Sequence, residues 1–317
     1  HVIATTSNFS MSRTKWFREI YNSNCSQGAI LSILPFNQGS QQDVIALVDH
    51  IYDEMAVDLE YIVPFAGISE NGRDISRIDS RSELSHRIML TNTVRLLGAV
   101  KSRKEASGIV SRPAMILLPL SPNHGIFGFD GLYAESKLSL ESLLNKWSSE
   151  GWEDYLSIVG AVIGWTRGTG LMAANNMVSP GVEHYGIRTF SQAEMAFNLM
   201  ALFHPSIVSL SQHSPIWADL GGGFDTVPNL KAISDSIRSS LLKQAALKRA
   251  VINDLRADNI IMKPAQPVTV SVKPTATFAG TPFPTLPSPE TVNQMSKELK
   301  DMVDLERVVV CVGYGEV

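Results

Sequence analysis

The chain has 317 residues, of which 44% are hydrophobic, so it is long enough to bury one large core or two ordinary ones. Its formal net charge of −4 argues against binding to nucleic acid or to an anionic membrane. Cys25 and Cys311 are far apart and form no CxxC pair, so we predict neither a metal site nor a disulfide framework, which fits a reducing cytoplasm. No apolar stretch reaches the roughly 20 residues that span a bilayer, and no signal peptide is expected.

Strand and helix patterns alternate through the first two thirds of the chain. Apolar runs predict strands at 1–5, 29–35, 59–63, 115–120, 156–163 and 216–220, with buried strands at 29–35 and 115–120. Helices are predicted between them, after a Ser40-x-x-Asp43 cap, over 82–101, and after a Ser191-x-x-Glu194 capping box. This alternation predicts an α/β fold with a doubly wound parallel sheet.

The last third of the chain differs in composition. Residues 231–255 have a helical and more charged pattern. Seven of the sixteen prolines lie between Pro264 and Pro289, with almost no charge, which predicts an extended linker. A short helix and a strand-like run follow. Because the chain begins and ends in strand-like runs, we expect it to be a piece of a longer polypeptide.

The stretch 115–139 carries the strongest chemical signal. Ser121 follows a predicted strand, and Tyr133 and Lys137 lie one turn apart on the same face of the next helix. The three side chains should therefore meet at the carboxyl end of a strand, where open α/β sheets bind ligands. Taken alone, Tyr-x-x-x-Lys is a weak signal, because a half-exposed tyrosine beside a solvated lysine is common; the serine at the preceding strand end strengthens it.

These three groups suit the reduction of a ketone by hydride transfer with proton delivery to the developing alkoxide. A free phenol has a pKa of about 10, so a tyrosine needs a nearby cation before it exchanges protons readily near neutral pH. Lys137 is placed to supply that charge and to lower the pKa of Tyr133. Ser121 can donate a hydrogen bond to the same carbonyl oxygen.

The ordered set Asn92, Ser121, Tyr133 and Lys137, with PFAG at 64–67, resembles the short-chain dehydrogenase/reductase superfamily. PFAG stands where that superfamily usually has Asn-Asn-Ala-Gly. Longer strings narrow the resemblance to the ketoreductase region of the α subunit of fungal type I fatty acid synthase. They are PFNQGSQQDV, SELSHRIMLTN, SPNHGIFGFDGLYAESKLSLE, IGWTRGTGLMAANN, RTFSQAEMAFNL and DLERVVV. The similarity runs from residue 1 to about 227 and resumes at Asp304.

The resemblance implies a Rossmann-like 3-oxoacyl-carrier-protein reductase that uses NADPH within a multifunctional, cytoplasmic enzyme. It implies that Tyr133 protonates the keto oxygen, that Lys137 also holds the nicotinamide ribose, and that Ser121 binds the carbonyl. Asn92 would hold a water that relays protons to Lys137. The implied cofactor-binding residues are Thr6, Ser7, Asn8, Asn37, Gln38, Ala66, Gly67, Tyr133, Lys137, Gly164 and Thr166. By the resemblance, Asn37 and Gln38 match the turn over the adenine, and Ala66 and Gly67 match the strand end beside the adenosine ribose. Two alternatives remain open: Asn92 could merely cap a helix kink, and Asn37 could be an ordinary turn residue.

A glycine-rich loop follows the predicted strand at 156–163. Gly164, Gly168 and Gly170 have the GxxxGxG spacing that short-chain reductases use for a cofactor pyrophosphate. The residues after them make a weak helix start, and no acidic residue ends a following strand. In this superfamily the phosphate loop also precedes the Tyr-x-x-x-Lys helix. The favoured interpretation is a loop that packs over the nicotinamide and helps to form the acyl pocket.

Domain boundaries follow from the resemblance and the composition. We predict a ketoreductase region over 1–228, a helical extension over 229–262, a proline-rich linker and short helix over 263–303, and the start of the ketosynthase-side region over 304–317. The partners implied are an acyl carrier protein whose phosphopantetheine carries the 3-oxoacyl chain, other α subunits, and the β subunit. Neither nucleic acid nor membrane is expected as a partner.

Two departures from the family pattern bear on the cofactor. The first strand and glycine loop of the superfamily would precede His1, so this fragment is expected to lack them and to bind NADPH poorly alone. The family often reads TTSRFS where this chain has Asn8, and asparagine cannot bind the 2′-phosphate in the bidentate manner of arginine. Arg13 is a candidate substitute.

Two other functions are weighed against the reductase. One is a scaffolding segment of the synthase with weak or no activity, which the intact Ser-Tyr-Lys set disfavours. The other is a free-standing sugar or steroid reductase, which the abrupt ends and the proline-rich linker disfavour. The sequence does not separate primary fatty acid synthesis from a dedicated starter-unit synthase.

Overall fold

A computed structural model describes residues 1–108, 112–172, 178–227, 229–262 and 288–298. The chain divides into two compact units, residues 1–250 and 251–317, and the first contains every strand described below. The predicted proline-rich linker and the strand-like C-terminal run lie outside the described residues. Within the described part of the chain, no helix is both long and apolar enough to cross a membrane.

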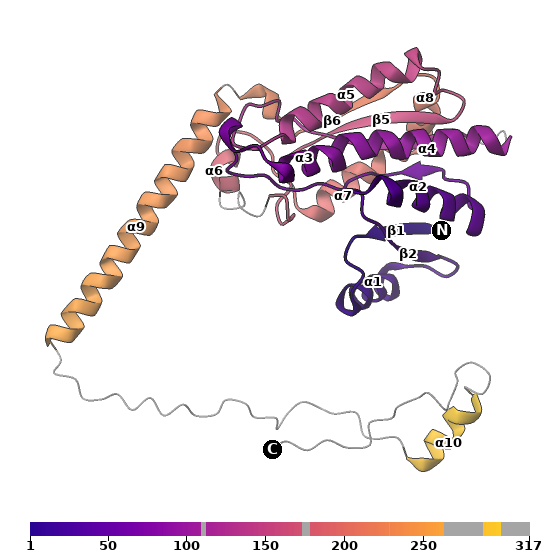
Figure 1. Ribbon diagram of the computed structural model, residues 1–317. Coiled ribbons are helices and arrows are strands. Elements are labelled where there is room, and N and C mark those ends of the chain that lie inside the picture. Colours follow the sequence, from indigo (N-terminus) through magenta and orange to yellow (C-terminus); the bar gives the residue numbers. More distant parts are fainter. Residues whose placement is uncertain (109–111, 173–177, 228, 263–287, 299–317) are drawn as a thin grey trace. The chain divides into compact units, whose positions relative to one another are not determined.

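The strands and helices alternate as the sequence predicts (Figure 1). The strands are β1 (Val2–Thr6), β2 (Leu31–Pro35), β3 (Tyr61–Ile62), β4 (Ala114–Leu120), β5 (Leu156–Ile163) and β6 (Ile216–Leu220). The helices are α1 (Met11–Asn24), α2 (Gln41–Asp49), α3 (Ser80–His86), α4 (Asn92–Ser107), α5 (Tyr133–Ser149), α6 (Ser179–Glu183), α7 (Gln192–Ala201), α8 (Pro205–Ser211), α9 (Leu230–Met262) and α10 (Pro289–Glu298). Both predicted caps are present: Ser40 accepts from the Asp43 N–H, and Ser191 and Glu194 form a reciprocal capping box.

All the strand pairs are parallel, but the strands form two separate sheets. β1 pairs with β2, and the other four strands follow the order β3-β4-β5-β6. Among the described residues, β1 and β3 each pair on one side only.

Helices cover both faces of the four-stranded sheet. Because side chains alternate along a strand, Ile116 and Leu118 of β4 pack against α4 and α5, whereas Met115 and Leu117 pack on the opposite side near α7 and α8. Every residue of β4 is buried. These contacts confirm the α/β, doubly wound class predicted from the sequence.

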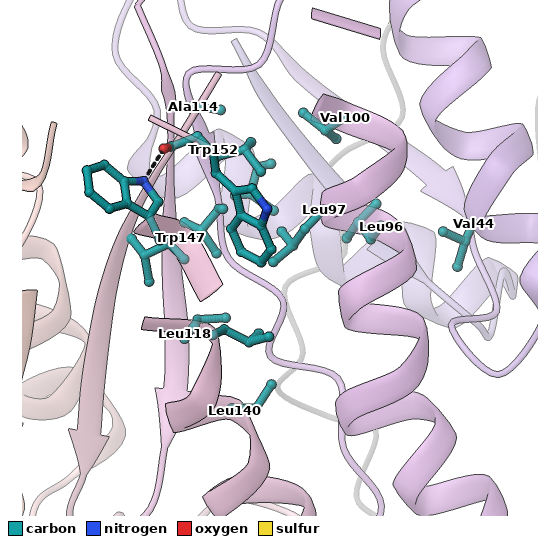
Figure 2. Packing of buried hydrophobic residues seen from close by; sticks show 14 of the residues in the cluster. Val44, Leu96, Leu97, Val100, Ala114, Leu118, Leu140, Trp147 and Trp152 are labelled. Atoms are coloured by element: carbon teal, nitrogen blue, oxygen red, sulfur yellow. Dashed lines mark hydrogen bonds between the residues drawn. The ribbon is translucent and has the colours of Figure 1, made fainter. Parts of the chain in front are cut away.

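The larger core lies between the sheet and helices α2, α4 and α5 (Figure 2). Val44 of α2 and Leu97 of α4 are buried there with Trp147 of α5. The indole N–H of Trp147 donates to the Leu156 carbonyl at 2.6 Å, so this large side chain is buried with its polar group satisfied. The hydrogen bond ties α5 to the start of β5 and fixes the helix that carries Tyr133 and Lys137.

Three predicted elements need correction. Residues 29–35 do not form a buried strand: β2 is half-buried, because in the described part of the chain it pairs with β1 alone, and its last residue, Pro35, is exposed. The strand at 59–63 is shortened to Tyr61–Ile62. The helical segment over 82–101 is interrupted by a π-helical turn at Arg87–Thr91, which separates α3 from α4. Such single π turns widen a helix locally and release a backbone carbonyl from the α-helical ladder.

Candidate functional site

The end of β4 and the start of α5 lie on the wall of a cleft with a volume of about 930 Å³. Ser121 follows β4 directly, and the turn between them contains glycines 125, 128 and 131, all with positive φ, before α5 begins at Tyr133. The cleft is lined by Ser121, Tyr133, Lys137, Gly164 and Thr166, together with apolar side chains of later segments. The convergence predicted for Ser121, Tyr133 and Lys137 is therefore present in the structure.

Lys137 is buried at the base of this cleft. Its ammonium donates to the Pro119 carbonyl at 2.8 Å and lies 5.8 Å from the centroid of the Tyr133 ring. Burial lowers the pKa of Lys137 to about 8. Near neutral pH the side chain remains mainly protonated, and it holds its charge close to the tyrosine.

Tyr133 differs from the sequence prediction in one respect. Burial raises the pKa of its phenol, a hydrogen bond with the Ser121 hydroxyl opposes that change, and the Asp130 carboxylate adds to it. The lowering of the Tyr133 pKa predicted for Lys137 therefore does not outweigh burial in this structure, and the role of Lys137 toward the phenolate stays a prediction. The ammonium is bound to Pro119 O and lies 5.8 Å from the centroid of the Tyr133 ring, while Tyr133 is half-buried at the cleft. Tyr133 is held as a protonated donor.

The loop after β5 forms a second wall of the cleft. A Cβ on Gly164 would lie 2.7 Å from the backbone oxygens of Leu220 and Gly221, so only glycine allows the ends of β5 and β6 to approach. The Thr166 hydroxyl donates to the Gly164 carbonyl at 3.1 Å, and both residues line the cleft. Gly164 thus has a packing role where β5 and β6 end, and the interpretation of this loop as one that packs over the nicotinamide stays a prediction.

Asn92 lies at the junction of the π-helical turn and α4 and is fully buried. Its amide donates to the backbone carbonyl of Gln38 and accepts from Arg95 Nη1 at 2.7 Å. Asn92 does not line the cleft. Its position at a helix irregularity suits the alternative role at a kink, and the predicted water relay stays a prediction.

Gln38 is buried beside the same π-helical turn. Its side-chain amide donates to the Ile88 carbonyl at 2.9 Å and to the Thr93 hydroxyl at 3.1 Å. These bonds join the loop after β2 to the π-helical turn and to α4. The amide nitrogen of Gln38 is therefore already hydrogen-bonded, and a contact with the adenine would have to involve other atoms of this residue.

The remaining residues predicted for the adenosine end do not line the cleft; they are Thr6, Ser7, Asn8, Asn37, Ala66 and Gly67. Thr6 is the last residue of β1, and the others follow the carboxyl ends of β1, β2 and β3. The Asn37 side chain accepts from the Gly39 N–H at 3.0 Å, as in an ordinary turn. Arg13, the candidate substitute for an arginine at position 8, lies over the Trp16 ring at 5.2 Å. The structure thus assembles the reacting end of the predicted site without bringing these residues to it.

Sequence reasoning missed two acidic residues beside Tyr133. Glu70 is buried and accepts from the Leu132 N–H at 3.0 Å. Asp130 accepts from the Asn123 side-chain amide at 2.8 Å, and burial, followed by the nearby Glu135, raises its pKa. The sequence feature connected with Glu70 is Gly131, because the lack of a side chain there leaves room for the Glu70 carboxylate.

Comparison with known proteins identifies the relatives of this chain. The fatty acid synthase subunit alpha of Schizosaccharomyces pombe is 52% identical over 323 residues, which cover 100% of this chain and 17% of that protein. The corresponding subunit of Saccharomyces cerevisiae is 47% identical over 326 residues, with 100% and 17% covered. The whole chain matches one segment of the fungal fatty acid synthase α subunits. This confirms the resemblance drawn from the sequence, and the chain spans about a sixth of the length of these relatives. No protein-family model matches the chain.

Solved structures support the fold independently of these relatives. A short-chain dehydrogenase/reductase from Burkholderia xenovorans superposes with a TM-score of 0.58 at 14% identity, covering 72% of this chain and 85% of that one. A gluconate 5-dehydrogenase from Burkholderia cenocepacia, solved with NADP and tartrate, gives a TM-score of 0.56 at 14% identity, with 71% and 86% covered. At this identity the likeness shows the fold alone, and it is the fold that the sequence predicts.

Proposed function

We propose that residues 1–228 reduce a 3-oxoacyl thioester, carried by an acyl carrier protein, to the 3-hydroxyacyl thioester with NADPH as reductant. The observation that carries the proposal is the meeting of Ser121, Tyr133 and Lys137 in one cleft, in a chain about half identical to fungal fatty acid synthase α subunits. An acyl carrier protein, other α subunits and the β subunit are the proposed partners, in the cytoplasm.

Each polar side chain of the cleft has its own role in the proposed reaction. Ser121 donates a hydrogen bond to the keto oxygen and orients it toward Tyr133. Tyr133, protonated because of its burial, donates its proton as negative charge develops on that oxygen. The buried ammonium of Lys137 stabilises the phenolate that this transfer leaves behind. Asn92 is the proposed holder of the water that returns a proton to Lys137.

The residues of the cleft suit the nicotinamide end of NADPH, which supplies a hydride when bound. Tyr133 and Lys137 present polar groups at the cleft wall, and Gly164 and Thr166 close it from the β5 side. Phe127, Trp165 and Leu199 line the apolar remainder, which suits an acyl chain. For the adenosine end we propose the residues that follow β1, β2 and β3: Thr6, Ser7, Asn8, Asn37, Gln38, Ala66 and Gly67.

The experiment is reduction of an acetoacetyl thioester by the full-length assembled synthase, followed by NADPH oxidation. Tyr133→Phe removes only the proton donor, so we expect at least a roughly 100-fold loss of turnover, the usual share of general acid catalysis. Tyr61→Phe, on the 40% exposed Tyr61, is the matched control and should leave the rate unchanged. Unchanged NADPH oxidation in Tyr133→Phe would instead support a scaffolding role for this segment.

A further inference from the structure

Glu70 is a buried acidic residue outside the Ser-Tyr-Lys set, in the loop that follows β3. Its side chain is fully buried, and one oxygen, Oε2, accepts from the Leu132 N–H at 3.0 Å. The other oxygen, Oε1, has no hydrogen-bond partner among the described residues, and the nearest cation, Arg73 Nε, is 4.0 Å away. Because burial of a carboxylate is costly unless its surroundings favour the charge, this residue needs an explanation.

The contact falls on the first turn of the helix that carries the proton donor. Leu132 is the N-cap residue of α5 and offers no side-chain cap, while Tyr133 is the first helical residue. A carboxylate beside a helix N-terminus is stabilised by the unpaired N–H groups and the helix dipole. Glu70 thus performs from another segment what the glutamate of a capping box performs within a helix.

The surrounding backbone is matched to this contact. Gly131 has a φ of +62°, and a Cβ there would lie 2.5 Å from Glu70 Oε2. The Gly72 N–H donates to the Phe129 carbonyl at 2.7 Å, and the Gly131 N–H donates to the Arg73 carbonyl at 3.1 Å. The loop at 70–73 therefore holds the segment 129–132 through both side-chain and backbone hydrogen bonds.

We propose that Glu70 is a positioning residue, which fixes the start of α5 and so sets the place of the Tyr133 hydroxyl relative to the substrate carbonyl. This inference rests on the proposed reductase function. Removal of the carboxylate frees the Leu132 N–H and loosens the turn that carries Tyr133. Proton transfer depends steeply on the distance between the reacting atoms, whereas binding of the substrate over the whole cleft does not.

The test uses the full-length assembled synthase, with kcat, both KM values and the primary isotope effect of NADPH deuterated at the transferred hydrogen. For Glu70→Ala we expect kcat to fall by about 10- to 100-fold with KM values within about twofold, and the isotope effect to rise because chemistry becomes slower. Glu70→Gln keeps an acceptor oxygen for Leu132 and should retain at least about a third of kcat. Glu54→Ala, whose side chain is 73% exposed, is the control.

Each outcome decides the inference. A kcat of Glu70→Ala within about threefold of wild type, or a raised KM with unchanged kcat, would overturn it. If Glu70→Ala does not assemble, Glu70→Asp replaces it: its shorter carboxylate should lower kcat more than Glu70→Gln does, and equal kcat values would overturn the positioning role. Wild-type enzyme that does not reduce the thioester would refute the proposed function itself. If instead Tyr133→Phe is inactive and Glu70→Ala is normal, only the inference fails.

Discussion

Replacing Gln38 with leucine separates two roles that the sequence and the structure assign to this residue. The resemblance places Gln38 at the adenine, whereas its side-chain amide donates to the Ile88 carbonyl at 2.9 Å and to Thr93 Oγ1 at 3.1 Å. Leucine has a similar volume but no donor. Gln38→Leu should therefore weaken the π-helical turn at Arg87–Thr91 without removing a contact in the cleft.

The magnitude follows from these bonds. Thr93 Oγ1 also donates to the Ile88 carbonyl at 3.2 Å, so neither acceptor loses its last partner in the variant. The loss is then two ordinary hydrogen bonds, about 1–2 kcal/mol after leucine regains some apolar burial. Since 1.4 kcal/mol is about a factor of ten, amide hydrogens of the segment 88–95 should exchange roughly tenfold faster.

The assay is hydrogen exchange of peptides over this segment in the assembled synthase, together with the KM for NADPH. We expect faster exchange and an NADPH KM within about twofold of wild type. Gln42→Leu is the matched control, because Gln42 is exposed on the neighbouring helix α2. A roughly tenfold rise in the KM for NADPH with unchanged hydrogen exchange would refute this reasoning and support a contact between Gln38 and the adenine.

Three further predictions concern charge and the cofactor. Burial lowers the pKa of Lys137 from 10.5 to about 8. Between these pH values the unfolded chain binds more protons at this site, so the site favours the folded state increasingly as pH rises. The free energy of unfolding can be measured at several pH values for wild type and for Lys137→Met. Across that window the wild-type value should rise by up to about 3 kcal/mol relative to the variant, and an equal pH dependence in the two proteins would contradict the assignment. Asn8→Arg should lower the KM for NADPH relative to NADH by about tenfold, because a guanidinium binds a phosphate in a bidentate manner; an unchanged ratio would show that position 8 does not meet the 2′-phosphate. The isolated 317 residues should bind NADPH weakly, as the resemblance implies, and micromolar binding in a fluorescence titration would refute this.

Much of the fold could be predicted because its signals are local. The apolar run of β4 is long enough to identify a strand covered on both faces, and the capping pattern of Ser191 and Glu194 marks the start of α7. Tyr133 and Lys137 had to share a helix face because they are four residues apart. Ser121 could be joined to them because a strand end precedes that helix.

The errors arose where an element depends on its neighbours. The run at 29–35 is as apolar as a central strand, yet β2 is half-buried because, among the strands that the structure describes, it pairs with β1 alone. The helical periodicity over 82–101 gave no sign of the π-helical turn, which is stabilised by Gln38 from another segment. Neither fact is encoded in the local spacing of apolar residues.

The sequence alone determined the order of strands and helices and the identity of the three polar groups that meet at the end of β4. The tertiary structure decided their electrostatics: burial, rather than the spacing of Lys137, governs the pKa of Tyr133. It also decided that Glu70 meets Leu132, which lies 62 residues away. The physical reason is that spacing along a helix or strand is fixed by backbone geometry, whereas desolvation and contacts between distant segments exist only once the chain has packed.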